Sequence, residues 1–238
     1  VTLKPRFIQA LANWGLVWDR LHDPGKAVEI YQRALSVKKD EAPIFVRLGT
    51  SFMKMSQYEK AKAAFESALT LGTARWSVFH DMGVIYEQEG APEKALTFYR
   101  RALSMRKGAS ETHFRIAGVL KELGKRGEAV SHFRQAISLD PDNANAHYGL
   151  AQVLLAQGDA EGGAKLLSTF STLKEYEGRL VPLKRAVETA PRDPQAAYDL
   201  AMLHMEYGRM QKGLTILQRI LKMHPDFTKA KDRIEESR

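Results

Sequence analysis

Alanine recurs every 34 residues in the first part of the chain, at Ala27, Ala61, Ala95 and Ala129. Each is followed four residues later by an aromatic residue and seven residues later by a second alanine. The aromatics are Tyr31, Phe65, Tyr99 and Phe133, and the second alanines are Ala34, Ala68, Ala102 and Ala136. A fixed period of this length indicates a stack of small similar repeats and not one globular core. Such a stack presents a long surface to a partner.

The residues before each alanine carry large apolar side chains at spacings of three, four and seven. In the first copy these are Leu11, Trp14 and Trp18, and Gly15 stands beside them. This spacing places the side chains on one face of a helix. A short break such as Glu89-Gly90-Ala91-Pro92 follows, and its Gly and Pro end one helix and begin the next. Each repeat is therefore predicted to be a pair of helices.

These in-phase positions resemble the tetratricopeptide repeat (TPR) family, whose pattern is W-x2-L-G-x2-Y, A-x3-F and P. Four copies match, and the final proline of the pattern is present in the fourth copy as Pro141. Lys39, Thr73 and Lys107 stand in its place in the first three copies. The resemblance implies an all-α fold, a right-handed superhelical solenoid of antiparallel helix pairs with about six repeats.

The phase of the pattern predicts where the repeats begin and end. Repeats one to four are expected at 8–41, 42–75, 76–109 and 110–143. An expanded or irregular fifth repeat is expected at 144–193, a sixth at 194–227, and a polar C-terminal capping helix at 228–238. Residues 1–7 align with the end of a second helix, so we expect them to be the end of an upstream repeat in a longer array.

The fifth repeat exceeds the period by 16 residues. The extra length lies within 161–193, where the apolar pattern continues and Pro182 interrupts it. One long helix that kinks at Pro182 would account for this segment, and so would two helices that meet near Glu177 and Gly178. An additional separate helix would reverse the direction of the stack, and the single long or kinked helix is favoured.

Composition narrows the classes of function. The net charge is +8, but basic and acidic residues alternate, as in Glu59-Lys60 and Glu93-Lys94. This alternation is typical of a solvated helix face and disfavours nucleic acid as a partner. The chain lacks cysteine, and no stretch approaches the roughly 20 apolar residues of a membrane span. Cytoplasm and periplasm are both compatible with these features.

No sequence motif of a phosphate-binding loop, a zinc protease or a hydrolase nucleophile is present. His113 and His147 share one repeat position, but adjacent repeats lie about 10 Å apart, which is too far for one metal ion. We therefore expect no enzyme, with no catalytic residues, no metal, no cofactor and no small-molecule substrate.

The resemblance also implies a binding surface, because the first helices of TPR arrays line a concave groove. Repeat positions 5, 6 and 9 are among those that tend to face it. The candidate partner-binding residues at these positions are Asn13, Arg47, His80, Asp81, Phe114, Arg115, Tyr148, Gln152, Tyr198 and Met202. Their apolar rings and flanking arginines suit a protein or peptide ligand with apolar anchors and acidic residues.

Two functions follow from these features. The first is a non-catalytic protein–protein interaction scaffold or adaptor that binds a peptide or helix of a partner in the groove. The alternative is a structural or accessory subunit of a larger complex, for which self-assembly and oligomerisation are compatible with the sequence. The predicted upstream repeat and the irregular fifth repeat fit this alternative, and the scaffold or adaptor is the favoured function.

Overall fold

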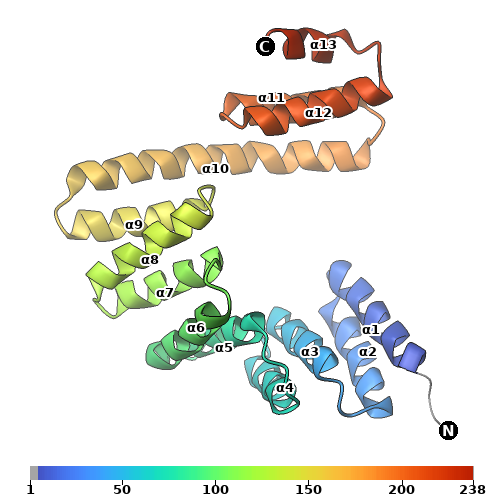
Figure 1. Ribbon diagram of the computed structural model, residues 1–238, viewed down its shortest axis with the longest axis vertical. Helices are drawn as coiled ribbons and strands as arrows, with labels where there is room; N and C mark the ends of the chain where they lie inside the picture. Colours follow the sequence, from blue (N-terminus) through green and yellow to red (C-terminus); the bar gives the residue numbers. More distant parts are fainter. Residues whose placement is uncertain (1–4, 238) are drawn as a thin grey trace. The chain divides into compact units, whose positions relative to one another are not determined.

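Helices account for all the regular secondary structure of the computed structural model, which describes residues 5–237. The helices up to Pro141 belong to one unit (Figure 1). They are α1 (Pro5–Arg20), α2 (Pro24–Val37), α3 (Ala42–Lys54), α4 (Tyr58–Thr70), α5 (Trp76–Gln88), α6 (Pro92–Met105), α7 (Ser110–Glu122) and α8 (Arg126–Leu139). We refer to this part as the N-terminal unit.

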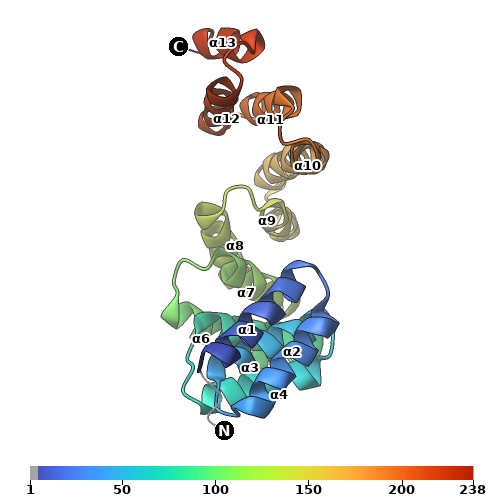
Figure 2. The same cartoon turned by 90° about the vertical axis from the view of Figure 1, so that its right-hand side faces the viewer.

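The C-terminal unit begins at Asp142. Its helices are α9 (Ala144–Ala156), α10 (Ala160–Thr189), α11 (Pro194–Glu206), α12 (Met210–Met223) and α13 (Thr228–Glu235). In both units each odd-numbered helix up to α11 makes its most extensive contacts with the helix that follows it. For example, α11 and α12 lie side by side (Figures 1 and 2). The described helices thus form six pairs and a final short helix, which confirms the all-α prediction and agrees with about six repeats.

The repeating aromatics fill the centre of each pair in the N-terminal unit. Tyr31, Phe65 and Tyr99 are fully buried. Each ring lies against a glycine of the preceding helix, and a Cβ built on Gly49 would lie 2.5 Å from Cε1 of Phe65. Gly15 and Gly83 face Tyr31 and Tyr99 in the same way. The glycines therefore let the two helices of a pair approach closely.

Every turn within a pair contains one residue in the left-handed region of backbone conformation. Glycine occupies this position in four pairs, at Gly90, Gly124, Gly158 and Gly208 with φ between 70° and 89°. In the first two pairs it is His22 and Ser56, with φ of 58° and 56°. Side chains other than glycine cost roughly 1 kcal/mol there, so these two turns keep the geometry at some expense of stability.

The segment after α9 is one continuous helix, α10, of 30 residues with Pro182 inside it. Figure 1 shows it as a single ribbon, so the favoured one-helix alternative is correct and a break near Glu177 and Gly178 is excluded. At about 1.5 Å per residue, α10 is about 45 Å long. It packs on α9 at one end and on α11 at the other.

The structure describes the C-terminal helix but not the first four residues of the chain. Residues 1–4, most of the expected upstream repeat, lie outside the described residues, and α1 already begins at Pro5. At the other end, α13 contacts α12 and buries Ala230 completely.

We predict that Gly49→Ala destabilises the protein by about 1–3 kcal/mol, because the added methyl group would overlap the buried ring of Phe65. The control is Gly118→Ala in α7, where a Cβ would meet no atom within 4 Å. That change should stabilise the helix by up to about 1 kcal/mol. Thermal unfolding followed by circular dichroism measures both, and shifts of the same sign would contradict the close-approach argument.

Candidate partner-binding site

The candidate site residues all lie on the first helix of a pair. In the N-terminal unit they are Asn13 on α1, Arg47 on α3, His80 and Asp81 on α5, and Phe114 and Arg115 on α7. In the C-terminal unit they are Tyr148 and Gln152 on α9, and Tyr198 and Met202 on α11. Within the N-terminal unit, α1 contacts α3, and α5 contacts α7. The two sets are described separately below.

His80 is held by neighbours within the chain. Its Nδ1 lies 2.9 Å from the Thr112 hydroxyl oxygen, and its ring lies 5.6 Å from that of Tyr99 between centroids. Burial, with a further effect of Arg115, lowers the pKa of His80 to about 4. The side chain is therefore neutral at neutral pH and packs between repeats.

Asp81 follows His80 in sequence but, unlike His80, has no hydrogen-bond partner among the described residues. Its side chain is half-buried, and no hydrogen bond or ion pair reaches its carboxylate from residues 5–237. Burial raises the pKa of Asp81 to about 7. A desolvated carboxylate without a partner is costly, so this group is a candidate for contact with a cationic or hydrogen-bonding ligand.

The two arginines of the candidate site differ in their partners. Arg115 donates to Glu111 at 3.0 Å and contacts Glu87 at 3.4 Å, so its charge is already balanced. Glu87 also accepts a hydrogen bond from the Tyr99 hydroxyl. Arg47 is half-buried and makes no ion pair with a carboxylate of the described residues. Arg47 is therefore better placed than Arg115 to meet an acidic ligand.

The aromatics at repeat position 5 pack against other aromatic rings within their own part of the chain. Phe114 lies 6.1 Å from Phe133, and Tyr198 lies 5.7 Å from Phe227, between ring centroids. Tyr148 lies 4.9 Å from Phe170 in the same way. Phe133 and Phe170 each lie on the second helix of the same pair, whereas Phe227 immediately precedes α13. Tyr148 nevertheless remains 41% exposed.

The remaining candidates make few contacts with one another. Asn13 is exposed and accepts a hydrogen bond from Gln9 at 3.1 Å. Gln152 is half-buried on α9. Met202 lines a pocket of about 450 Å³ between α10 and α11, where Pro182 and Arg179 also contribute. Met202 and Tyr198 both pack against the apolar core of the C-terminal unit.

A pocket of about 370 Å³ in the N-terminal unit holds functional candidates that sequence reasoning missed. Arg47 is joined there by Arg20, Lys54 and Arg75, and by the carboxylate of Asp19. Tyr31 donates a hydrogen bond to Asp19 at 3.0 Å, as Tyr99 does to Glu87. In both pairs the acidic residue precedes the tyrosine by 12 residues. This spacing is a sequence signal that could have identified Asp19 as a partner of Tyr31.

Two further findings concern metal sites and membrane spans. Among residues 5–237, no three His, Cys, Asp or Glu side chains gather as metal ligands. Within the same range, no helix is both long and apolar enough to cross a membrane.

Family comparisons match most of the chain. Models described as tetratricopeptide repeats match residues 46–111 and 182–232, and one described as a TPR repeat matches residues 117–158. No curated protein matches the chain in sequence.

Solved structures share the fold at low sequence identity. YrrB, described as a TPR protein with an unusual peptide-binding site, is 22% identical with a TM-score of 0.59, over 69% of this chain and 85% of that one. MamA from Desulfovibrio magneticus is 14% identical with a TM-score of 0.64, over 71% and 95%. PilF of Pseudomonas aeruginosa is 12% identical with a TM-score of 0.63, over 96% and 97%.

These matches confirm the resemblance carried by the repeated alanines and aromatics. They also agree with the helix pairs and with the solenoid architecture expected of the family. The chain belongs to the tetratricopeptide repeat family.

Proposed function

We propose that this protein is a non-catalytic interaction scaffold whose first helices bind a peptide or helix of a partner protein. Membership of the TPR family supports a role in protein–protein interaction in general. The peptide-binding site named in the description of YrrB is consistent with a peptide as the ligand, although that protein shares only 22% of its residues with this chain.

The observation that carries the proposal is the state of the charges on α3 and α5. Arg47 and Asp81 share repeat position 6 in successive repeats, and neither has an ionic partner within the described part of the chain. A desolvated carboxyl that only its own fold had to satisfy would normally be paired, because an unpaired one costs stability. The retention of Asp81 on a first helix is explained if a ligand supplies the missing partner.

Apolar anchors are available on other first helices, α7 and α9. Phe114 is half-buried on α7 of the N-terminal unit, and Tyr148 is partly exposed on α9 of the C-terminal unit. Each ring is steadied by a neighbouring aromatic, so little conformational freedom is lost when a ligand covers it. Rigid aromatic rings of this kind commonly carry a large share of the binding energy.

For peptides selected on this protein from a phage-displayed library, we predict that Phe114→Leu weakens binding of those that occupy the N-terminal unit, and Tyr148→Ala binding of those that occupy the C-terminal unit. The expected rise in Kd is about tenfold or more, which is about 1.4 kcal/mol. Fluorescence anisotropy measures Kd, and circular dichroism verifies that helicity is retained. The matched control is Phe98→Leu on the second helix α6, where Phe98 is half-buried and stacks on Tyr86 at 5.1 Å. Unchanged affinity in both site variants would move the binding site to another face.

The raised pKa of Asp81 predicts a pH-dependent cost to stability. In the unfolded chain the carboxyl titrates near 3.8, and in the folded chain at about 7. Between these pH values the folded state keeps a proton that the unfolded state releases, so stability falls as the pH rises from about 4 to 7 and stays low above that. The full shift is worth about 4 kcal/mol, and because the side chain is only half-buried we expect about 2 kcal/mol.

We therefore expect Asp81→Asn to raise the free energy of unfolding by about 2 kcal/mol at pH 8 and to change it little at pH 4. Urea unfolding at several pH values measures this. The control is Asp199→Asn, at the same repeat position in α11, where the carboxylate is exposed and already accepts a hydrogen bond from Gln195. A gain that does not depend on pH would show that Asp81 is not the titrating group.

One observation favours the second candidate function, a subunit of a larger assembly. Trp14 and Val17 on α1 are 47% and 49% exposed. Their equivalents in the next three repeats are almost fully buried: Leu48, Ser51, Met82, Ile85, Ile116 and Val119. The face of α1 that corresponds to a covered face in later repeats is thus open to a further helix.

This second candidate predicts that the sedimentation coefficient of the protein rises with its concentration, and that Trp14→Glu abolishes the rise by placing a charge on the open face. Val181→Glu in α10 is the control, because Val181 is 67% exposed and far from α1 in sequence. A wild-type protein that stays monomeric at all concentrations would contradict self-association through α1.

A further inference from the structure

The pocket beside Asp19 lies on the first helices of the N-terminal unit. Arg20 comes from the end of α1, Arg47 and Lys54 come from α3, and Arg75 immediately precedes α5. A volume of about 370 Å³ is in the range of pockets that hold organic ligands, and it exceeds what a single small ion needs. Four cationic side chains and one carboxylate therefore share one hollow.

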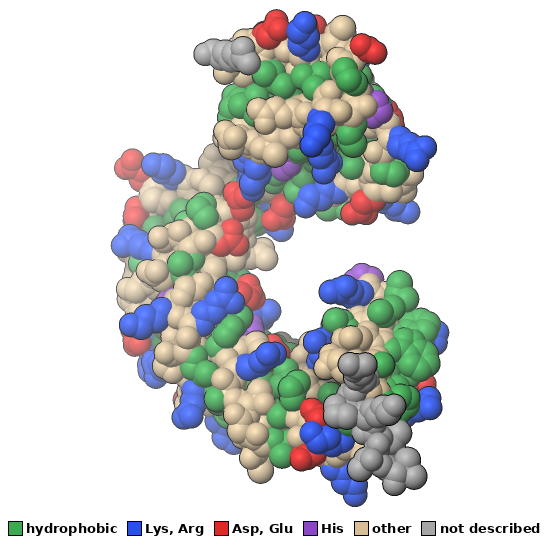
Figure 3. Space-filling view, turned by 45° about the vertical axis from the view of Figure 1, so that its right-hand side comes forward, with side chains coloured by type: hydrophobic (Ala, Val, Ile, Leu, Met, Phe, Trp, Pro, Cys, Tyr) green, Lys and Arg blue, Asp and Glu red, His purple; other side chains and the backbone are tan. Residues whose placement is uncertain are grey.

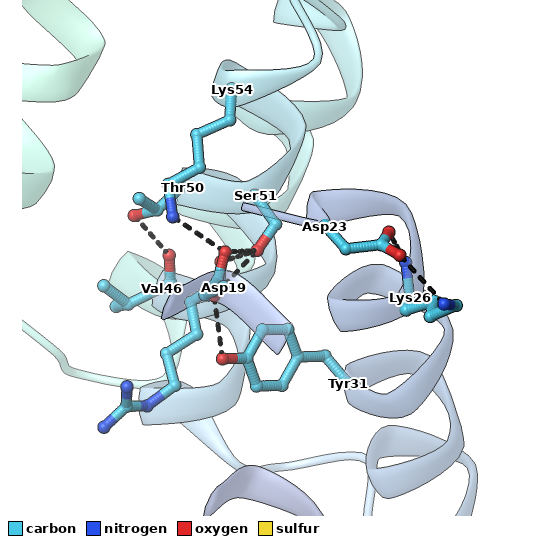
Figure 4. A network of polar contacts seen from close by, with 9 residues as sticks. Asp19, Asp23, Lys26, Tyr31, Val46, Thr50, Ser51 and Lys54 are labelled. Carbon is cyan, nitrogen blue, oxygen red and sulfur yellow. Dashed lines mark hydrogen bonds and ion pairs between the residues drawn. The ribbon is translucent and has the colours of Figure 1, made fainter. Parts of the chain in front are cut away.

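The carboxylate in this pocket is already satisfied by the protein. Figure 4 shows hydrogen bonds to Asp19 from the hydroxyl groups of Tyr31 and Ser51, and an ion pair with Lys54. The Lys54 ammonium lies 2.8 Å from Oδ1, and the side chain of Asp19 is only 9% exposed. Asp19 and Lys54 thus balance one another, and no carboxylate of the pocket remains for the arginines.

The three arginines are left with an excess of positive charge. Neither Arg20 nor Arg75 makes an ion pair with any of residues 5–237, and the same holds for Arg47. Like charges around one hollow repel each other, which costs stability unless an anion is present. Guanidinium groups hold carboxylates through two parallel hydrogen bonds, and this makes arginine well suited to acidic side chains.

We propose that this pocket binds successive Asp or Glu side chains of the partner segment. This inference rests on the proposed function, since the pocket and the proposed peptide site share Arg47 and the first helices. A protein segment suits the pocket better than nucleic acid does, because Lys and Arg on the face seen in Figure 3 are interspersed with acidic residues. A nucleic-acid backbone would require a continuous basic tract.

The test uses fluorescein-labelled hexaglutamate, with both ends blocked, and measures its Kd for the full chain by anisotropy. The pocket variant is Arg20→Gln/Arg75→Gln, in which both changed residues are exposed and leave the core intact. The control variant is Arg33→Gln/Arg134→Gln, which removes the same charge from exposed positions on second helices. We expect the Kd to rise about tenfold or more for the pocket variant and less than about twofold for the control.

Two results would overturn the inference. An equal loss of affinity in both variants would show attraction by net charge alone. Displacement of hexaglutamate by inorganic phosphate at ~1 mM would show a small-anion site. A third comparison separates this inference from the proposed function, because hexaglutamate carries no apolar anchor and its Kd reports on the pocket alone. If library peptides ignore Phe114 and Tyr148 while hexaglutamate still depends on the pocket, the proposed groove fails and the acidic-segment pocket stands.

Discussion

The architecture of the N-terminal unit depends on one contact, which in its first three pairs is the insertion of a ring from the second helix against a glycine of the first. Because a Cβ on Gly15, Gly49 or Gly83 would lie within 2.5 Å of the ring, the distance between the helices is fixed by the absence of a side chain. The fourth pair contains Ala117 at this position against Phe133, and both are buried. The candidate site residues of this unit all lie on the first helices of these pairs.

The helix pairs and their order could be predicted from the sequence. The residues that recur every 34 positions are the small and aromatic side chains on which the packing within each pair depends. The alanines at Ala27 and Ala61, for example, are completely buried where the pattern places them. The continuity of α10 was harder to predict. The helical spacing of apolar residues continues past Pro182, and this spacing would be the same for one helix and for two. The side-chain partners could not be predicted: the pairing of Arg115 depends on Glu87, which lies 28 residues from it along the chain.

Charge distinguishes the candidate site from the rest of the fold. Most ion pairs of the described residues lie on exposed surfaces, where they contribute little. Asp81 lies deeper and has no ionic partner within the described residues, so the fold bears a cost at this position. Proteins retain such costs where binding requires them, because residues that serve a ligand are seldom optimal for stability.

The length of α10 has a consequence for how the C-terminal unit comes apart. Repeat arrays can lose their terminal repeats one at a time, because each repeat contacts only its neighbours. Here Tyr176 and Arg179 of α10 contact His204 and Glu206 of α11, while Phe170 of the same helix contacts Tyr148 of α9. Fraying of α11 would expose half of a helix whose other half is still packed on α9. Helices α9 to α12 should therefore exchange their amide hydrogens as a single cooperative block, whereas the N-terminal pairs can open singly.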